Sequence, residues 1–175
     1  RYDNYRNGII ENAFKPELSN GSLMDLGVYC VHPMVRLFGL PKTLHADPVF
    51  LPNGVDGAGS VIAGYGDMQV QMMYSKICDS HLPSEIQGEN GSLVLDKIAQ
   101  PQKMTLYLRG QEPKELPVVK CSNNMEYEAA RWAQWMEGTA PQQELFRVQE
   151  DSRMEMQVLD EIRRLADIHF PADET

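Results

Sequence analysis

The chain has 175 residues, of which 42% are hydrophobic and 23% are charged, so it is long enough for one domain with its own core. Its formal net charge of −9 disfavours binding to nucleic acid or to an anionic membrane surface, because both attract basic faces. No apolar run approaches the length of about 20 residues that a transmembrane helix needs. The first residue is Arg1 rather than Met, and we expect the chain to be part of a longer protein.

The three cysteines are Cys30, Cys78 and Cys121. They are an odd number, they are widely separated, and none has the spacing of a metal-binding pair. We therefore expect reduced, mostly buried thiols in a cytoplasmic protein, with no metal site.

The first predicted elements are a polar N-terminal loop and a helix. Residues 1–21 carry turn signals and are predicted as an entry loop that can include a short helix. Residues 22–38 are predicted as a helix, because Ser22 and Asp25 have the spacing of the capping pattern S-x-x-D and Gly39 provides a stop signal.

Residues 43–120 are predicted as a mostly antiparallel sheet, because short runs rich in Val, Ile, Leu, Tyr and Met alternate with turn dipeptides. Pro113 and Pro117 predict that the last run lies at an edge of the sheet, since proline has no N–H for a second neighbour. The runs with strand character are Leu44–Leu51, Gly59–Tyr65, Met68–Ile77, Glu85–Glu89, Ser92–Asp96, Met104–Arg109 and Glu115–Val119.

Residues 124–169 are predicted to be helical, with one helix over Met125–Glu137 and a second over Gln143–Ile168. The order of helix, sheet and helices predicts the α+β class, with helices packed on one face of a large, open-faced sheet. We expect the uncovered face to form an oligomer interface. The sequence holds no glycine fingerprint of a dinucleotide-binding unit and no phosphate-binding loop, so a cofactor would be held mainly by another part of the protein.

One narrow polar stripe runs along the helix predicted for residues 22–38. Asp25, Tyr29, His32 and Arg36 follow the spacing i, i+4, i+7, i+11, and at about 100° per residue they fall within an arc of about 60°. The rest of the helix is almost entirely apolar, so we expect it to be buried with this stripe facing a cleft. Pro33 predicts a kink in its middle. A carboxylate, a phenol, an imidazole and a guanidinium together can move a proton and orient a polyhydroxy or carbonyl substrate.

Each stripe residue also has a purely structural interpretation on spacing alone. Asp25 would complete a cap with Ser22, and Tyr29 would pack its ring while its hydroxyl finds a partner. His32 would be a hydrogen-bonded core histidine, which we favour over a metal ligand because a metal needs three or four convergent ligands. Arg36 would pair with an acidic neighbour.

The segment Asn20–Leu40 contains the motif Asp-x-Gly-x-Tyr, formed by Asp25, Gly27 and Tyr29. This segment resembles the start of the C-terminal domain of the glucose-fructose oxidoreductase / inositol dehydrogenase (Gfo/Idh/MocA) family of NAD(P)-dependent oxidoreductases. It is most like the branch that includes dimeric dihydrodiol dehydrogenase. Three further segments resemble the family more weakly and occur in the same order as in the family, so the resemblance covers residues 20–173. These segments are Glu85–Asp96, Tyr127–Gly138 and Ile168–Asp173.

The resemblance implies that a Rossmann domain precedes this one and binds NAD or NADP. It implies that Tyr29 is the acid/base group, that Asp25 lies beside it and helps to position or polarise the site, and that His32 lines the substrate pocket. We take Arg36 as a second candidate for substrate binding. The implied substrate is a sugar, polyol or diol, and the implied assembly is a homo-oligomer through the open sheet face.

The glycine fingerprint and the Glu-Lys-Pro motif that the family carries in its nucleotide-binding domain are missing from this sequence. We therefore do not expect the chain to catalyse hydride transfer alone. Two other classes stay open: a non-catalytic oligomerisation or regulatory module, and a metal-dependent site built on Asp25 and His32.

Overall fold

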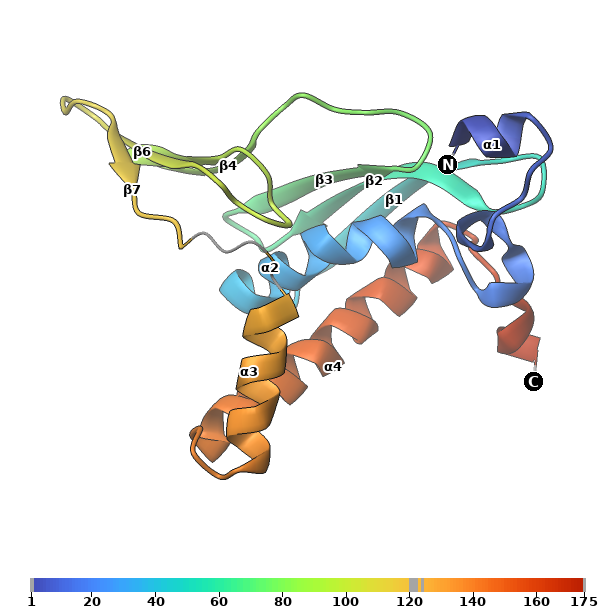
Figure 1. The fold of residues 1–175 in the computed structure, drawn as a ribbon. Coiled ribbons are helices and arrows are strands. Elements are labelled where there is room, and N and C mark those ends of the chain that lie inside the picture. The colour runs from blue at the N-terminus through green and yellow to red at the C-terminus, as the bar shows by residue number, and fades with distance from the viewer. Residues whose placement is uncertain (1, 120–122, 124, 175) are drawn as a thin grey trace. The chain divides into compact units, whose positions relative to one another are not determined.

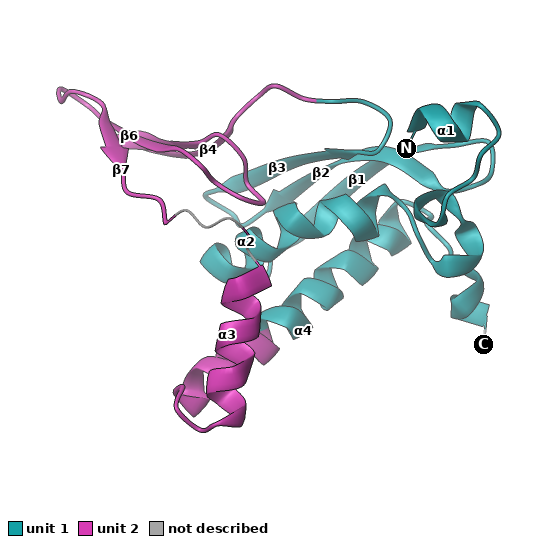
Figure 2. Ribbon diagram, in the orientation of Figure 1, with its two compact units in different colours: residues 1–79, 151–175 teal, residues 80–150 magenta. Residues whose placement is uncertain are grey.

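A computed structural model describes residues 2–119, 123 and 125–174 of the chain (Figure 1). The chain divides into two compact units (Figure 2). Unit 1 comprises residues 1–79 and 151–175, and unit 2 comprises residues 80–150. Within the described residues, no helix combines the length and the apolar character that crossing a bilayer requires.

Unit 1 contains an antiparallel sheet of three strands in the order β1-β2-β3. These strands are β1 (Thr43–Phe50), β2 (Asp56–Gly64) and β3 (Gln69–Ser75). The residues of one face are buried, as on Val61 and Ala63 of β2 and on Met72 and Tyr74 of β3. Their spacing of two residues is the period that puts side chains on the same face of a strand.

The helices of unit 1 begin with α1 (Tyr2–Arg6) and two short 3-10 turns, η1 (Asn12–Phe14) and η2 (Pro16–Leu18). A π-helical turn, η3 (Leu23–Gly27), leads directly into α2 (Val28–Phe38). Near the C-terminus lie α4 (Gln142–Leu165), which belongs to unit 1 from Asp151 onward, and the 3-10 turn η4 (Pro171–Glu174).

The core of unit 1 lies between the sheet and the helices that cover its inner face (Figure 1). The buried side chains of η3 and α2 in this core are Leu23, Val31, Met34 and Val35. Those of α4 and the residues after it are Val158, Leu159, Ile162, Ala166, Ile168 and Phe170. The outer face of the sheet carries exposed apolar side chains, among them Val49, Ile62 and Met73. This sheet therefore has one covered face and one open face.

Unit 2 contains an antiparallel sheet of four strands in the order β4-β5-β6-β7. The strands are β4 (Ser84–Gly88), β5 (Gly91–Leu95), β6 (Met104–Leu108) and β7 (Lys114–Leu116). The unit also holds α3 (Met125–Met136) and the first residues of α4, where Arg131 and Glu144 form an ion pair of 3.4 Å.

The α+β class and the antiparallel strands are confirmed, and each of the seven predicted runs contains strand residues, although the last run, Glu115–Val119, is a strand only up to Leu116. The strands belong to two sheets rather than to the single sheet that we predicted. β7 lies at an edge, as predicted from Pro113 and Pro117, and it ends at Leu116 because Pro117 has no N–H to continue the ladder. Residues 22–38 are helical, and α2 continues through Pro33 without a break.

The cysteines are less buried than predicted. Cys30 is half-buried on α2, where burial raises the pKa of its thiol. Cys78 is exposed, because it lies in the irregular segment that follows β3. Cys121 lies outside the described residues.

Candidate active site

The helical segment that carries the polar stripe is capped by a residue distant in sequence. The backbone N–H of Leu23 donates a hydrogen bond of 2.7 Å to Oδ2 of Asp56, the first residue of β2. Ser22 has helical dihedral angles and makes no side-chain capping bond, and Asp25 pairs elsewhere. The predicted cap of Ser22 with Asp25 is therefore wrong, because the Asp56 carboxylate already occupies the end of the helix.

Gly21 makes room for this cap. A Cβ atom at position 21 would overlap Oδ1 of Asp56. The carboxylate can thus approach the first turn only where the backbone has no side chain. Negative charge at a helix N-terminus is favoured by the unpaired N–H groups there and by the helix dipole.

Asp56 is 1% exposed, and burial raises the pKa of its carboxyl above the ordinary value of 3.8. Backbone N–H groups, led by that of Leu23, and the positive charge of Lys76 oppose this rise without cancelling it. The pKa of the buried Tyr74 hydroxyl is also raised, first by burial and then by the charge of Asp56. The end of the helix therefore rests on a small, buried polar cluster.

We expect the Asp56→Asn variant to gain stability relative to the wild type as the pH rises. The raised pKa means that the folded chain holds the proton more tightly than the unfolded chain. The contribution of Asp56 is therefore fully present below 3.8 and is lost as the pH rises through the folded-state pKa. Asparagine does not titrate, so this loss disappears. Urea unfolding of both proteins at several pH values measures the difference, and a difference independent of pH would contradict the expectation.

Gly27 lets the π-helical turn lie close to the sheet. A Cβ atom there would lie 2.9 Å from Cδ1 of Leu23 and 3.2 Å from Cδ1 of Tyr74 on β3. π-helical turns are rare and are frequent at functional sites. The glycine of the Asp-x-Gly-x-Tyr motif therefore has a packing role, and the close approach brings Asp25 to the end of β3.

Asp25 forms an ion pair with a buried lysine at that point. Nζ of Lys76, the residue after β3, lies 3.0 Å from Oδ2 of Asp25. The side chain of Lys76 is 6% exposed and that of Asp25 is 44% exposed. One oxygen of the Asp25 carboxylate is therefore paired with the Lys76 ammonium group, while a large part of the side chain remains accessible to a ligand.

Tyr29 lies on the first turn of α2 and is 52% exposed. Among the residues that the structure describes, none forms a hydrogen bond with its hydroxyl. A phenol one turn after a charged and partly exposed carboxylate is free to meet a substrate hydroxyl. This arrangement is suited to proton transfer.

The second half of the stripe pairs with α4. Nδ1 of His32 lies 2.6 Å from Oε2 of Glu155, and Nη1 of Arg36 donates to Oδ2 of Asp151 at 2.6 Å. His32 keeps 48% of its side chain exposed, whereas Asp151 is buried. The four stripe residues all reach the surface. His32 and Arg36 pair with acidic residues of α4, whereas Asp25 pairs with a lysine. The expectation of a largely buried helix is wrong at its end, since Leu37 and Phe38 are exposed.

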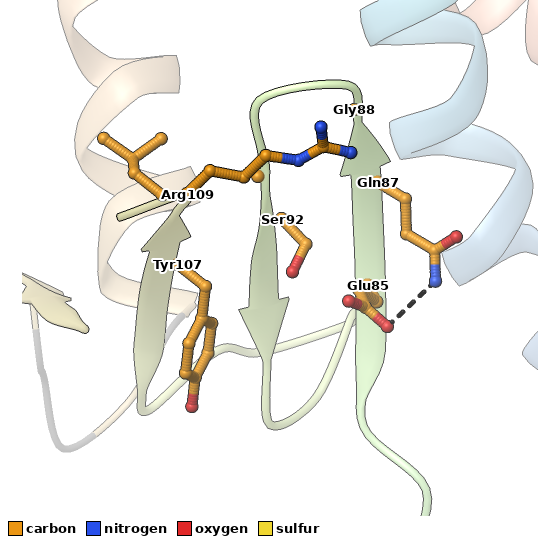
Figure 3. Close-up of a pocket in the computed structure, with 8 residues that line it drawn as sticks. Glu85, Gln87, Gly88, Ser92, Tyr107 and Arg109 are labelled. Carbon is orange, nitrogen blue, oxygen red and sulfur yellow. Dashed lines mark hydrogen bonds between the residues drawn. The ribbon is translucent and has the colours of Figure 1, made fainter. Parts of the chain in front are cut away.

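A separate hollow of about 420 Å³ lies on the polar face of the unit 2 sheet (Figure 3). Its wall includes Glu85 and Gln87 of β4, Ser92 of β5 and Tyr107 of β6, and Nε2 of Gln87 donates to Oε2 of Glu85 at 3.1 Å. It contains none of the predicted site residues. The described residues also hold no group of three or more His, Cys, Asp or Glu side chains placed to bind a metal ion.

Comparison with known proteins identifies the family. Residues 1–94 match the profile described as the GFO/IDH/MocA C-terminal domain. Over 174 residues the chain is 40% identical to scyllo-inositol 2-dehydrogenase (NADP(+)) IolU of Bacillus subtilis (strain 168), a match that covers 99% of this chain and 53% of that protein. Over 173 residues it is 42% identical to the uncharacterized oxidoreductase YgjR of Escherichia coli (strain K12), a match that covers 99% of this chain and 52% of that protein.

Among solved structures, UDP-N-acetylglucosamine 3-dehydrogenase GnnA from Acidithiobacillus ferrooxidans matches with a TM-score of 0.70 and 14% identity, covering 86% of this chain and 48% of that chain. At this identity the similarity concerns the fold alone. The chain belongs to the GFO/IDH/MocA family, as its Asp-x-Gly-x-Tyr motif indicated. It spans about half the length of the curated relatives that it matches.

Proposed function

We propose that this chain is the substrate-binding part of an NAD(P)-dependent oxidoreductase that acts on a CH–OH group of a sugar, polyol or diol. Two observations carry the proposal: Asp25 is held by Lys76, and the exposed Tyr29 one turn later has no hydrogen-bond partner for its hydroxyl among the described residues. The similarity to a protein named scyllo-inositol 2-dehydrogenase (NADP(+)) favours NADP and a cyclic polyol within these classes.

We infer that the dinucleotide is held mainly outside the described residues. The N-terminus of the helix at Leu23 would be the natural place for a phosphate, but the carboxylate of Asp56 fills it. We therefore propose that another part of the protein holds NAD(P). When bound, the nicotinamide accepts or donates the hydride.

Tyr29 and Asp25 are the proposed catalytic residues. The phenolic oxygen of Tyr29 takes the hydroxyl proton of the substrate during oxidation and returns it during reduction. Asp25 lies one turn earlier and directs the substrate hydroxyl or the phenol through its exposed carboxylate. Proton transfer by a positioned side chain contributes about 10²–10⁴-fold to a rate.

His32 and Arg36 are the proposed substrate-binding residues. Because their contacts differ, we propose a different role for each. The half-exposed ring of His32 has one nitrogen on Glu155 and leaves the other for a substrate hydroxyl. Arg36 is held by the buried Asp151, so we propose that its guanidinium contacts the substrate at the end of the stripe that lies away from Asp25.

We further propose a cytoplasmic homo-oligomer formed through the open sheet face. Exposed apolar side chains on that face, such as Ile62 and Met73, support the proposal. A second copy would cover them, since exposed apolar surface of this kind is typical of interaction sites.

The complete protein is expected to bind NADPH and to oxidise a cyclic polyol such as scyllo-inositol with NADP⁺. Nucleotide titration and the absorbance of the reduced nicotinamide measure the two steps. A protein that binds neither NAD(H) nor NADP(H) would instead be the non-catalytic oligomerisation or regulatory module.

A further inference from the structure

Lys76 is a buried cation that the sequence did not single out. It is the residue after β3, and its backbone N–H donates a hydrogen bond of 2.8 Å to the carbonyl of Gly57 on β2. Its side chain is only 6% exposed. A buried ammonium group is costly unless it is paired and hydrogen-bonded. The groups that pair with the Lys76 ammonium therefore indicate its role.

The ammonium group has partners in three segments. Nζ lies 3.0 Å from Oδ2 of Asp25 and donates a hydrogen bond of 2.8 Å to the carbonyl of Ala13. It also lies 5.6 Å from the centroid of the Phe14 ring, within the range of a cation–π contact. The positive charge of Lys76 in addition favours the ionised form of Asp56.

These contacts fix the positive charge of Lys76 beside the proposed catalytic carboxylate of Asp25. The backbone of Lys76 is tied to the sheet and its head to the N-terminal loop at Ala13, so little freedom is left to the ammonium group. The ion pair fixes Oδ2 of Asp25 and leaves the exposed remainder of the carboxylate to face outwards. A close ion pair that involves a buried ammonium group also restrains the positions of both groups.

We propose that Lys76 is a positioning residue of the active site, which holds Asp25 in the orientation that it needs beside Tyr29. This inference rests on the proposed function. Lys76 does not touch the substrate and acts only through Asp25. It also links the conformation of the loop at Ala13 and Phe14 to the orientation of the carboxylate.

The competing interpretation is a purely structural lysine that secures the N-terminal loop through the carbonyl of Ala13. A double-mutant cycle separates the two, because residues that act through one another show non-additive effects. The variants are Lys76→Met, Asp25→Asn and their combination in the complete protein, with kcat and KM measured for each. Lys42→Met removes an exposed lysine of the same unit and serves as the matched control.

If Lys76 positions Asp25, Lys76→Met lowers kcat by about 100-fold, the loss that a small displacement of a reacting group produces. The double variant is then no slower than Asp25→Asn alone, and Lys42→Met retains the wild-type kcat. Multiplied losses in the double variant, or an unchanged kcat in Lys76→Met, overturn the proposal. Should Lys76→Met fail to fold, Lys76→Gln is used with the same expectation, because it keeps a donor for the Ala13 carbonyl.

Tyr29→Phe is measured beside the cycle to separate the two levels of inference. If Tyr29→Phe is inactive and the losses at Lys76 and Asp25 multiply, only the positioning role of Lys76 fails. If Tyr29→Phe keeps full turnover, the proposed function of the site fails. The two failures are therefore distinguishable.

Discussion

Replacing Tyr29 with phenylalanine in the complete protein is expected to lower kcat by about 10²–10⁴-fold, the range that a positioned proton-transfer group supplies. The variant loses only the phenolic oxygen, and that oxygen has no partner among the described residues that its removal would disturb. The folded structure and nucleotide binding should therefore be nearly unchanged. Steady-state kinetics with a cyclic polyol and NADP⁺, together with nucleotide titration, provide the measurement.

Tyr65→Phe is the matched control for this substitution. The hydroxyl of Tyr65 donates a hydrogen bond of 2.9 Å to the carbonyl of Gly39, so its loss costs about 1 kcal/mol of stability. It lies outside the proposed site, and its kcat should equal that of the wild type. Equal turnover in Tyr29→Phe and the wild type would remove Tyr29 from the mechanism.

Replacing Gly21 with alanine is expected to destabilise the folded protein by about 3 kcal/mol. The new methyl group would overlap Oδ1 of the buried Asp56, so the carboxylate must leave the N–H of Leu23. Overpacking costs about 1–3 kcal/mol and the loss of a cap costs about 0.5–2 kcal/mol. The free energy of unfolding in urea measures the change.

Gly88→Ala is the control for a general effect of adding a methyl group to glycine. A Cβ atom at position 88 meets nothing closer than the carbonyl of Gly91 at 3.7 Å. Its stability should remain within about 0.5 kcal/mol of the wild type, as is usual for exposed positions. If Gly21→Ala were equally mild, the tight fit between Gly21 and Asp56 would not exist.

The strands and helices could be predicted because their signals are local. The run Met104–Arg109 alternates, turn dipeptides divide the strands, and Pro113 and Pro117 indicated that the last strand lies at an edge, although it ends at Leu116 rather than at Val119. The spacing argument for Asp25 and Tyr29 assumed an α-helix, and it could not show that Leu23–Gly27 forms a π-helical turn. Periodicity describes one element at a time, so it could not show that the strands divide into two sheets.

The partners of the site residues could not be predicted because they are distant in sequence. Asp56 lies 33 positions after Leu23, and the local pattern S-x-x-D predicted a different cap. In the sequence, Lys76 is an ordinary polar residue near the end of a predicted strand, and nothing there indicates that it pairs with Asp25. One signal was available: Asp151 and Glu155 are spaced i, i+4 on a predicted helix, which matches the spacing of His32 and Arg36.

The π-helical turn Leu23–Gly27 sets the rotational phase between the two proposed catalytic side chains. A chain shorter by one residue between Asp25 and Tyr29 would swing the carboxylate by about 100° around the helix axis. The phenol and the carboxylate would then point to different sides. Redesign of the proposed substrate site for another substrate must therefore conserve the length of this turn as strictly as the chemistry of its residues.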